Sequence, residues 1–343
     1  MKKQKILVTG GTGYIGSHTV VELQQSGYEV VIIDNLSNSS VLVLDNIAKI
    51  TGIRPGFEQF DLADATLTAD FFVRHPDLAG IIHFAAFKAV GESMQKPLEY
   101  YRNNVYSLIN ILEGMKTTGI SNMVFSSSCT VYGQPDELPV TEQAPIKPAW
   151  SAYGNTKQMC EDILRFTTMA HPLKAIALRY FNPIGAHHTS LIGELPLGIP
   201  SNLVPFITQT AIGKRDSLSV FGSDYDTPDG TAIRDYIHVV DIAKAHVIAV
   251  ERMINGKGKQ ALEIFNLGTG TGYSVLEVIN AFEKVSGMKL NYKIVPRRPG
   301  DIEKVWADTR LANKELGWKA EKDIDEMMLT AWEWEKSLAR RKA

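Results

Sequence analysis

The chain has 343 residues, of which 44% are hydrophobic, and its formal net charge is −2. This length predicts about two domains, or one domain with a sizeable second lobe, around a substantial core. A charge so close to neutral points to neither a nucleic acid nor a membrane surface as partner. Two cysteines are too few for a disulfide framework, and no apolar run is long enough to span a membrane, so we expect a cytoplasmic protein.

The first elements in chain order are a predicted strand over residues 5–9, a glycine-rich turn and an apolar-periodic helix through residue 23. The turn contains Gly10, Gly13 and Gly16. Residues without a Cβ allow a tight turn and let a pyrophosphate approach the backbone N–H groups at a helix N-terminus. The pattern therefore predicts a dinucleotide-binding turn.

A second strand, over residues 28–34, ends in Asp34, which stands 18 residues after Gly16. A carboxylate at this position hydrogen-bonds the adenosine ribose hydroxyls and repels a 2′-phosphate. Residues 35–38 contain no arginine that would attract such a phosphate. The predicted cofactor is therefore NAD and not NADP.

Strands and helices alternate through the rest of the first half. Further strands are expected at 56–62, 80–86, 122–128 and 175–182, and the clearest helices at 97–116 and 152–170. This alternation predicts right-handed crossovers and an α/β fold with a Rossmann-type doubly wound parallel sheet. Such sheets bind ligands at the carboxyl ends of their strands, where we expect Asp61, Ala85, Ala86 and Ser128.

After residue 182 the sequence is rich in Gly, Pro, His and Ser, and the elements become shorter. Helices are expected at 202–214 and 241–253, and strands at 218–222, 234–238 and 262–267. These elements predict a smaller mixed α/β substrate lobe. We therefore divide the chain into a dinucleotide-binding domain over residues 1–182, to which a segment of about 234–250 returns, and a ligand-binding lobe over residues 183–343.

Tyr153 and Lys157 have a spacing that suits catalysis. Positions four apart lie on one face of a helix, so a phenol and an ammonium can point into the same pocket. A free tyrosine has a pKa of about 10 and is a poor base at neutral pH, whereas a nearby cation lowers that pKa. The motif also occurs on solvated helix faces, so the support for a catalytic role comes from the dinucleotide turn and from Ser128. A serine at a strand end can instead hydrogen-bond its own backbone, which is the alternative for Ser128.

Two adjacent histidines, His187 and His188, raise the question of a metal site. Neighbouring side chains rarely converge on one ion, and no cysteine or carboxylate cluster surrounds these two in the sequence. We therefore expect no metal.

Several blocks together resemble the extended short-chain dehydrogenase/reductase superfamily. They are the glycine turn at 10–16, the serines at 126–128, and Tyr153 with Lys157 on the next helix. Four further blocks, at 83–86, 126–133, 179–187 and 234–239, look like the UDP-glucose 4-epimerases of that superfamily. The resemblance covers about residues 5–335, which is nearly the whole chain.

The resemblance implies reversible epimerisation at C4 of UDP-hexoses, through a transient 4-keto sugar and with tightly bound NAD. Tyr153 would take the proton from the sugar 4-hydroxyl, Ser128 would hydrogen-bond the same hydroxyl, and Lys157 would hold the nicotinamide ribose and keep the pKa of Tyr153 low. The alternative is another NAD-dependent nucleotide-sugar oxidoreductase of the superfamily, which would release NADH. A non-catalytic dinucleotide sensor is disfavoured because the tyrosine and the lysine are both present.

Sugar-nucleotide dehydratases of this superfamily carry an Asp-Glu pair just before Val-Tyr-Gly. This chain has Cys129 and Thr130 there, and neither replaces the acid and base that elimination of water needs. By resemblance, Thr130 would help Ser128 to orient the sugar, and Cys129 would be a small buried filler.

The resemblance also assigns the binding residues and a homodimer formed through helices 97–118 and 152–170. Two arginines suit a diphosphate, although a surface ion pair is the alternative for each. The residues assigned to NAD are Gly10, Gly13, Tyr14, Ile15, Gly16, Asp34, Asn35, Asp61, Leu62, Phe84, Ala85, Ala86, Lys88, Asn103, Tyr153, Lys157 and Phe181. Those assigned to the UDP-sugar are Ser128, Thr130, Tyr153, Asn182, Asn202, Phe221, Arg234, Arg298, Asp301 and Val305.

Val305 bears on the range of substrates. Family members have either a tyrosine or a smaller residue at this position. A large ring there crowds the sugar 2-substituent, whereas a small side chain leaves room for an N-acetyl group. We therefore expect UDP-GlcNAc and UDP-GalNAc to be accepted alongside UDP-glucose and UDP-galactose.

Overall fold

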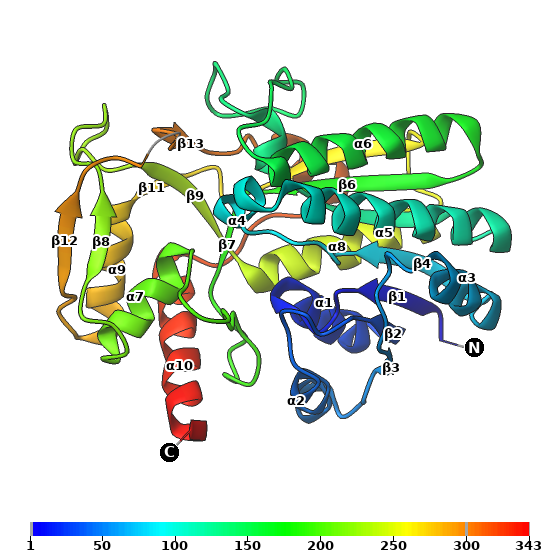
Figure 1. Cartoon of the computed structure of the whole chain (residues 1–343), viewed down its shortest axis with the longest axis horizontal. Helices are drawn as coiled ribbons and strands as arrows, with labels where there is room; N and C mark the ends of the chain where they lie inside the picture. The colour runs from blue at the N-terminus through cyan, green and yellow to red at the C-terminus, as the bar shows by residue number, and fades with distance from the viewer. Residues whose placement is uncertain (1–2, 299–300, 343) are drawn as a thin grey trace.

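The computed structural model describes residues 3–298 and 301–342, with a parallel sheet of seven strands at its centre (Figure 1). The strand order is β10-β6-β5-β4-β1-β2-β3, so the order reverses direction at β1. In doubly wound sheets the ligand crevice lies at such a reversal, here between β1 and β4. The strands are β1 Lys5–Thr9, β2 Glu29–Ile33, β3 Gly56–Glu58, β4 Leu78–His83, β5 Asn122–Ser128, β6 Lys174–Tyr180 and β10 Leu262–Leu267.

Helices cover both faces of this sheet (Figure 1). One face packs against α1 (Tyr14–Gln25), α2 (Leu42–Thr51) and α8 (Val239–Ile254). The other packs against α3 (Ala65–Arg74), α5 (Pro97–Thr118) and α6 (Ala152–Ala170), with the short α4 (Val90–Gln95) preceding α5. Because neither face meets water, successive strand residues such as Ile6, Leu7 and Val8 are all buried. The predicted fold class is confirmed.

Several strands end earlier than the sequence predicts, and the difference is largest for β3 and β4. β3 pairs with β2 over residues 56–58 alone, and Asp61 lies in the turn that follows, where its carboxylate accepts a hydrogen bond from the Ala63 N–H at 2.9 Å. β4 ends at His83, so Ala85 and Ala86 belong to the loop after it. Asp61, Ala85 and Ala86 therefore follow the carboxyl ends of β3 and β4, where a parallel sheet of this kind binds its ligand.

The smaller lobe is built mainly from later segments. A four-stranded sheet contains β7 (Asn182–Ile184), β9 (Ile233–His238), β11 (Gly272–Ser274) and β13 (Lys304–Val305), and β8 (Leu218–Phe221) pairs with β12 (Tyr292–Val295). The helices α7 (Leu203–Ala211), α9 (Val275–Ser286) and α10 (Ile324–Lys342) pack into the core of this lobe. The structure also has a short 3₁₀ helix at Cys129–Tyr132 and a short π-helix at Ala312–Leu316.

The segments that return to the large sheet differ from the expected 234–250. β9 belongs to the smaller sheet, whereas α8 packs on a face of the large sheet and β10 pairs with β6 from Leu262 to Leu267. The domain division at residue 182 stays a prediction. Within the described residues, no helix combines the length and the apolar character that crossing a membrane requires.

Candidate active site

The glycine turn joins β1 to α1 in a conformation that only glycines permit. Gly10 has a φ of +68°, and a Cβ on Gly16 would lie 2.2 Å from the Gly10 carbonyl oxygen. Gly13 precedes α1, and no side chain caps this helix end. The first backbone N–H groups of α1 are therefore free to bind an anion, as a pyrophosphate site requires.

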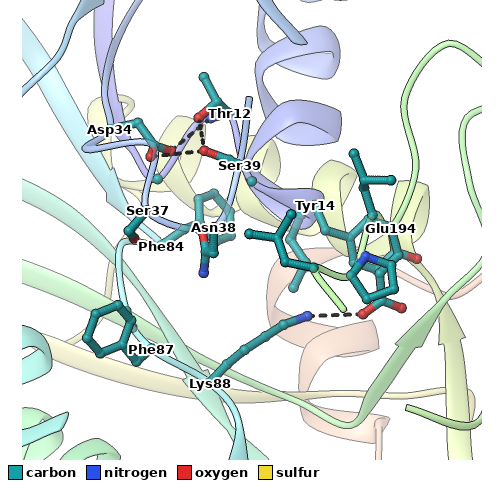
Figure 2. Close-up of a pocket in the computed structure, with 18 of the residues that line it drawn as sticks. Thr12, Tyr14, Asp34, Ser37, Asn38, Ser39, Phe84, Phe87, Lys88 and Glu194 are labelled. Atoms are coloured by element: carbon teal, nitrogen blue, oxygen red, sulfur yellow. Dashed lines mark hydrogen bonds and ion pairs between the residues drawn. The ribbon is translucent and has the colours of Figure 1, made fainter. Parts of the chain in front are cut away.

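Asp34 lies just past the end of β2 and organises the adjoining loop (Figure 2). Its carboxylate accepts hydrogen bonds from Thr12 N at 3.2 Å, Leu36 N at 2.9 Å and Ser39 Oγ at 3.2 Å. The loop brings further polar groups to the cavity, including Ser37 and Asn38. The sequence interpretation missed Thr12 and the residues at 37–39, although the run of small polar residues after Asp34 was a usable signal.

A cavity of about 960 Å³ opens beside the turn and is lined by every residue predicted to contact NAD except Phe181. Phe181 packs instead in an apolar cluster with Val131 and Val305. The segment 191–202 and the C-terminal helix also contribute to the lining, through residues that the sequence interpretation did not assign: Leu191, Gly193, Glu194, Leu197, Trp334 and Arg341. The glycine cradle, the uncapped helix end and Asp34 together fit a dinucleotide.

Lys88 makes an ion pair across this cavity (Figure 2). Its ammonium lies 3.1 Å from Glu194 Oε1, and the same oxygen accepts a hydrogen bond from Asn202 Nδ2 at 2.7 Å. Trp334 Nε1 donates to the Glu194 carbonyl at 2.7 Å. Lys88 was assigned to the cofactor and Asn202 to the nucleotide-sugar, yet both bind the carboxylate of Glu194. The sequence predicted no role for Glu194, because the segment that carries it has no periodic pattern.

Tyr153 and Lys157 are both buried on α6, where they line the cavity. Ser151 begins this helix by accepting a hydrogen bond from Gly154 N at 3.1 Å, which places Tyr153 in the first turn. Lys157 Nζ donates to the Ser126 carbonyl oxygen at 2.7 Å and lies 5.9 Å from the centre of the Tyr153 ring. The predicted pairing of phenol and ammonium on one helix face is therefore present.

Burial has the largest effect on the protonation of both groups. It raises the pKa of Tyr153 well above the ordinary value for tyrosine, and a hydrogen bond with the Ser128 side chain opposes this rise. It lowers the pKa of Lys157 to about 8, and the negative charge of Glu161 opposes this fall. The phenolate expected from the sequence thus needs more positive charge near Tyr153 than Lys157 alone provides.

Ser128 ends β5, and the 3₁₀ helix that follows carries Cys129 and Thr130. The Ser128 hydroxyl accepts a hydrogen bond from Thr130 N at 3.3 Å. Thr130 Oγ1 is buried without a hydrogen-bond partner among the described residues, and neither Ser128 nor Thr130 lines the 960 Å³ cavity. Burial raises the pKa of the Cys129 thiol to about 12, which suits a packing role.

The structure brings four of the predicted nucleotide-sugar residues together on the second lobe. Arg234 and Arg298 both bind Asp301, at 2.7 and 3.1 Å. The Arg298 guanidinium also lies 4.7 Å from the centre of the Phe221 ring. Residues 299–300, between Arg298 and Asp301, lie outside the described part of the chain. Two cations that share one anion retain a net positive charge, which suits a diphosphate.

The remaining predicted substrate residues are placed differently. Asn182 Nδ2 donates to the Asp235 carbonyl at 3.0 Å, and Val305 pairs with Arg234 in the register of β13 with β9. Val305 is buried in the cluster that contains Val131 and Phe181. Asn202 lies instead in the wall of the dinucleotide cavity.

The rings of His187 and His188 have their centres 4.2 Å apart and are tilted by 36° to each other. His187 Nδ1 lies 2.8 Å from Thr189 Oγ1. Across residues 3–298 and 301–342, no group of three His, Cys, Asp or Glu side chains is arranged to hold a metal ion.

A Rossmann sheet with a glycine turn, a Tyr-Lys pair on α6 and a serine at the end of β5 defines the class of extended short-chain dehydrogenases/reductases. The family model described as GDP-mannose 4,6 dehydratase matches residues 7–330. A UDP-glucose 4-epimerase of Haemophilus influenzae is 53% identical over 333 residues, which are 97% of each chain. The chain therefore belongs to the family of UDP-glucose 4-epimerases.

Solved structures of this family are similar over almost the whole chain. The UDP-glucose 4-epimerase from Stenotrophomonas maltophila, with bound NAD and formylated UDP-arabinopyranose, has a TM-score of 0.95 and 47% identity, covering 98% of this chain and 99% of that one. The enzyme from Bifidobacterium longum, in complex with NAD⁺ and UDP, has a TM-score of 0.92 and 47% identity, covering 97% and 98%.

Proposed function

We propose that this protein interconverts UDP-glucose and UDP-galactose by epimerisation at C4, with tightly bound NAD. The observation that carries the proposal is the buried arrangement of Tyr153 and Lys157 beside Ser128, on the wall of a cavity shaped for a dinucleotide. Cys129 and Thr130 stand where a dehydratase needs its carboxyl pair, and neither supplies an acid or base for elimination. Epimerisation needs a single acid/base group at O4, which is what the site offers.

The dinucleotide would lie along the first domain. The turn at Gly10, Gly13 and Gly16 would hold the pyrophosphate, Asp34 the adenosine ribose, and Lys157 the nicotinamide ribose. When bound, NAD would supply the reversible hydride acceptor that oxidation and re-reduction at C4 require. The remaining chemistry belongs to the protein's own side chains.

Tyr153 would hold the proton that moves to and from the sugar O4. Its phenolate is disfavoured by burial, so a cation beside it is needed to bring its pKa towards the working range. Lys157 would supply part of that positive charge, and a pKa of about 8 leaves most of it charged at neutral pH. Ser128 and Thr130 would hydrogen-bond O4 and orient the ring, and the unpartnered Thr130 Oγ1 supports this role.

The second lobe would hold the nucleotide end of the substrate. Arg234 and Arg298 would bind the diphosphate, with Asp301 fixing both guanidinium groups. Phe221, Asn182 and Asn202 would contact the uridine portion. Val305, a small side chain beside Arg234 in the strand pairing, would leave room for a 2-N-acetyl group, so UDP-GlcNAc and UDP-GalNAc are included in the proposed range.

We further propose a homodimer formed through α5 and α6 in the cytoplasm. These helices pack side by side (Figure 1), and with the loop before α6 they expose large apolar side chains. Exposed apolar side chains on two neighbouring helices are a feature of protein–protein interfaces. Both cysteines are free thiols, as in a reducing compartment. The exposed side chains are Leu98, Tyr106, Trp150, Met159, Phe166 and Met169.

The decisive experiment is incubation of the purified protein with UDP-galactose and, separately, UDP-GalNAc, with the products separated by chromatography. The proposal expects the C4 epimer of each substrate without accumulation of NADH. Accumulated NADH and an oxidised sugar would establish the oxidoreductase alternative instead. Tyr153→Phe should abolish turnover while NAD stays bound, because the change removes the O4 base and leaves the cradle intact.

A further inference from the structure

Three consecutive serines end β5, and each makes a different contact. Ser126 holds Lys157 through its carbonyl and lies 2.7 Å from the Tyr180 hydroxyl through its own Oγ. Ser128 accepts a hydrogen bond from Thr130 N at 3.3 Å, and its side chain lowers the pKa of Tyr153. Ser127, which has no part in the proposed function, donates to Glu161 Oε1 at 2.5 Å. The middle serine therefore turns away from the substrate and towards α6.

Glu161 is also bound by the next strand. Arg179 on β6 donates from Nε to Oε1 at 2.9 Å and from NH2 to Oε2 at 2.5 Å, and both side chains are buried. Ser127 and Arg179 are direct neighbours in the pairing of β5 with β6. Replacing a buried ion pair by apolar residues is often neutral or stabilising, so stability alone does not explain a charge pair at this place.

Glu161 follows Lys157 by four residues and Tyr153 by eight, which places all three on one face of α6. A helix held at Glu161 by two adjacent strands cannot rotate or slide without breaking a buried charge pair. We propose that Glu161, clamped by Arg179 and Ser127, is a positioning residue that holds Tyr153 and Lys157 in register with Ser128. The inference rests on the proposed function.

The groups facing Lys157 come from three elements. On α6 they are Tyr153, Cys160 and Glu161, on β5 the Ser126 carbonyl and the Phe125 ring, and on β4 His83. His83 is neutral near pH 7, because burial lowers its pKa to about 3. The carboxylate of Glu161 is thus the neighbouring charge that favours the ammonium form of Lys157 against burial.

A second buried pair in the same sheet provides a matched control. Arg252 on α8 donates to both carboxylate oxygens of Glu263 on β10, at 3.0 and 2.9 Å. Both side chains are 9% exposed, and neither lines the cavity that contains Tyr153. This pair has the same chemistry and joins a helix to a strand, but it lies outside the reaction site.

The test compares Glu161→Gln with Glu263→Gln in the NAD-loaded enzyme. Both should lose thermal stability, because each removes a carboxylate from a buried guanidinium. The loss should be smaller for Glu263→Gln, since Arg252 keeps the Glu315 carboxylate at 3.8 Å. Glu161→Gln alone should lower kcat for UDP-galactose by at least tenfold with little change in KM. It should also move the alkaline limb of the kcat profile to lower pH, since Lys157 without Glu161 loses its proton more easily.

Equal kcat values and superimposable pH profiles for the two variants would overturn the inference. If Glu161→Gln does not fold, Ser127→Ala tests the inference instead. This variant keeps the Glu161–Arg179 ion pair and removes the hydrogen bond from Ser127 to Glu161. A fall in kcat of threefold or more at unchanged KM supports the clamp, and an unchanged kcat overturns it. A wild-type protein that does not epimerise UDP-galactose refutes the proposed function instead, so the two failures are distinguishable.

Discussion

On the cofactor side of the site, the residues come from short contiguous segments: the turn at 10–16, the end of β2 at 34–35, and the loops after β3 and β4 at 61–62 and 84–88. On the nucleotide-sugar side, single residues arrive from distant parts of the chain, as Asn182, Phe221, Arg234 and Asp301 do. Backbone shape dominates the first side and charge–charge contacts between side chains dominate the second.

This difference predicts different responses to mutation. Where backbone makes the site, a single added methyl group disturbs it, because no side chain is free to move aside. Where side chains make the site, a substitution removes one contact and leaves the others, so the loss of binding is graded. The following predictions test this contrast, and the largest expected effect comes first.

Gly16→Ala should nearly abolish NAD binding. Its Cβ would lie 2.2 Å from the Gly10 carbonyl oxygen, so the turn must open. Overpacking of this size costs roughly 1–3 kcal/mol. If the whole of about 3 kcal/mol is lost from the binding free energy of NAD, the affinity falls roughly 100-fold. The NAD content of purified protein measures the effect. Gly91→Ala is the control, because its Cβ would meet no atom within 4 Å, and equal NAD loss in both variants would remove the backbone argument.

Arg234→Gln should raise KM for UDP-galactose roughly 10- to 100-fold and leave the NAD content unchanged, since a hydrogen bond to a charged group contributes about 1.5–3 kcal/mol. Steady-state kinetics and the NAD content together give the answer. Arg310→Gln is the control, because Arg310 binds Asp308 through a largely exposed side chain. Loss of NAD from the Arg234 variant would show that the two sides are not independent.

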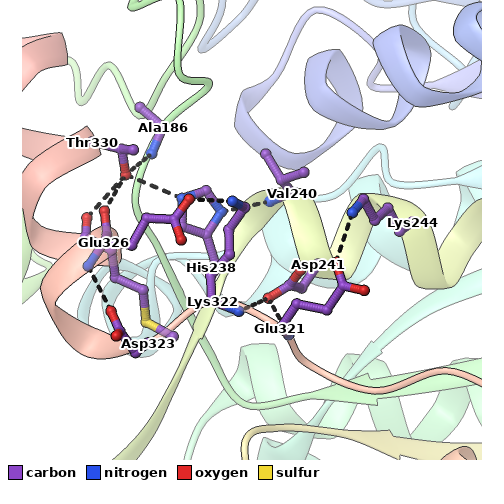
Figure 3. A network of polar contacts seen from close by, with 11 residues as sticks. Ala186, His238, Val240, Asp241, Lys244, Glu321, Lys322, Asp323, Glu326 and Thr330 are labelled. Atoms are coloured by element: carbon purple, nitrogen blue, oxygen red, sulfur yellow. Dashed lines mark hydrogen bonds and ion pairs between the residues drawn. The ribbon is translucent and has the colours of Figure 1, made fainter.

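Acid should destabilise the contact between β9 and α10 in the second lobe, which His238 makes (Figure 3). Its Nδ1 accepts from Val240 N at 3.1 Å, and its Nε2 lies 3.1 Å from Thr330 Oγ1 on α10, so both ring nitrogens are engaged in the neutral form. Burial lowers the pKa of His238 to about 2. Below about pH 6.5 the unfolded chain therefore binds a proton at this histidine that the folded chain does not, and His238 alone lowers stability by about 1.4 kcal/mol for each pH unit of acidification.

Urea unfolding at pH 7 and pH 5 measures this slope. The neutral variant His238→Asn should lose about 2 kcal/mol less than the wild type between those pH values, after correction for its lower stability at pH 7. His171→Asn, at the C-terminal end of α6, serves as the control. An unchanged slope in the His238 variant would assign the acid sensitivity to other groups.

Val305→Tyr should have the smallest effect, because it changes the size of the substrate pocket and not its charge. We expect turnover of UDP-GalNAc to fall roughly tenfold relative to UDP-galactose, as one overpacked contact costs about 1–3 kcal/mol. Val305 is already buried, so thermal unfolding of the variant should accompany the kinetics. An unchanged ratio of the two activities would show that Val305 does not limit the sugar 2-substituent.

The fold was predictable because its signals are local. β5 and α6 occur at the residues predicted, 122–128 and 152–170, since apolar runs and helical periodicity are contained within each element. Errors concentrate at strand ends, where β3 and β4 are shorter than predicted because the partner strand decides where pairing stops. The return of β10 to the large sheet was missed for the same reason, as sheet membership depends on strand pairing and not on composition.

By itself, the sequence determined the dinucleotide turn, the acid at Asp34 and the Tyr153–Lys157 pair, because each depends on spacing within one or two elements. Only the tertiary structure decided which side chains bind the same charged group. Glu194 joins Lys88 to Asn202, Asp301 joins two arginines, and Arg179 clamps Glu161 behind the reaction site. Such contacts link residues that are distant in the sequence, and their strength depends on burial. Neither the partners nor the strength of a contact therefore follows from the spacing of residues along the chain.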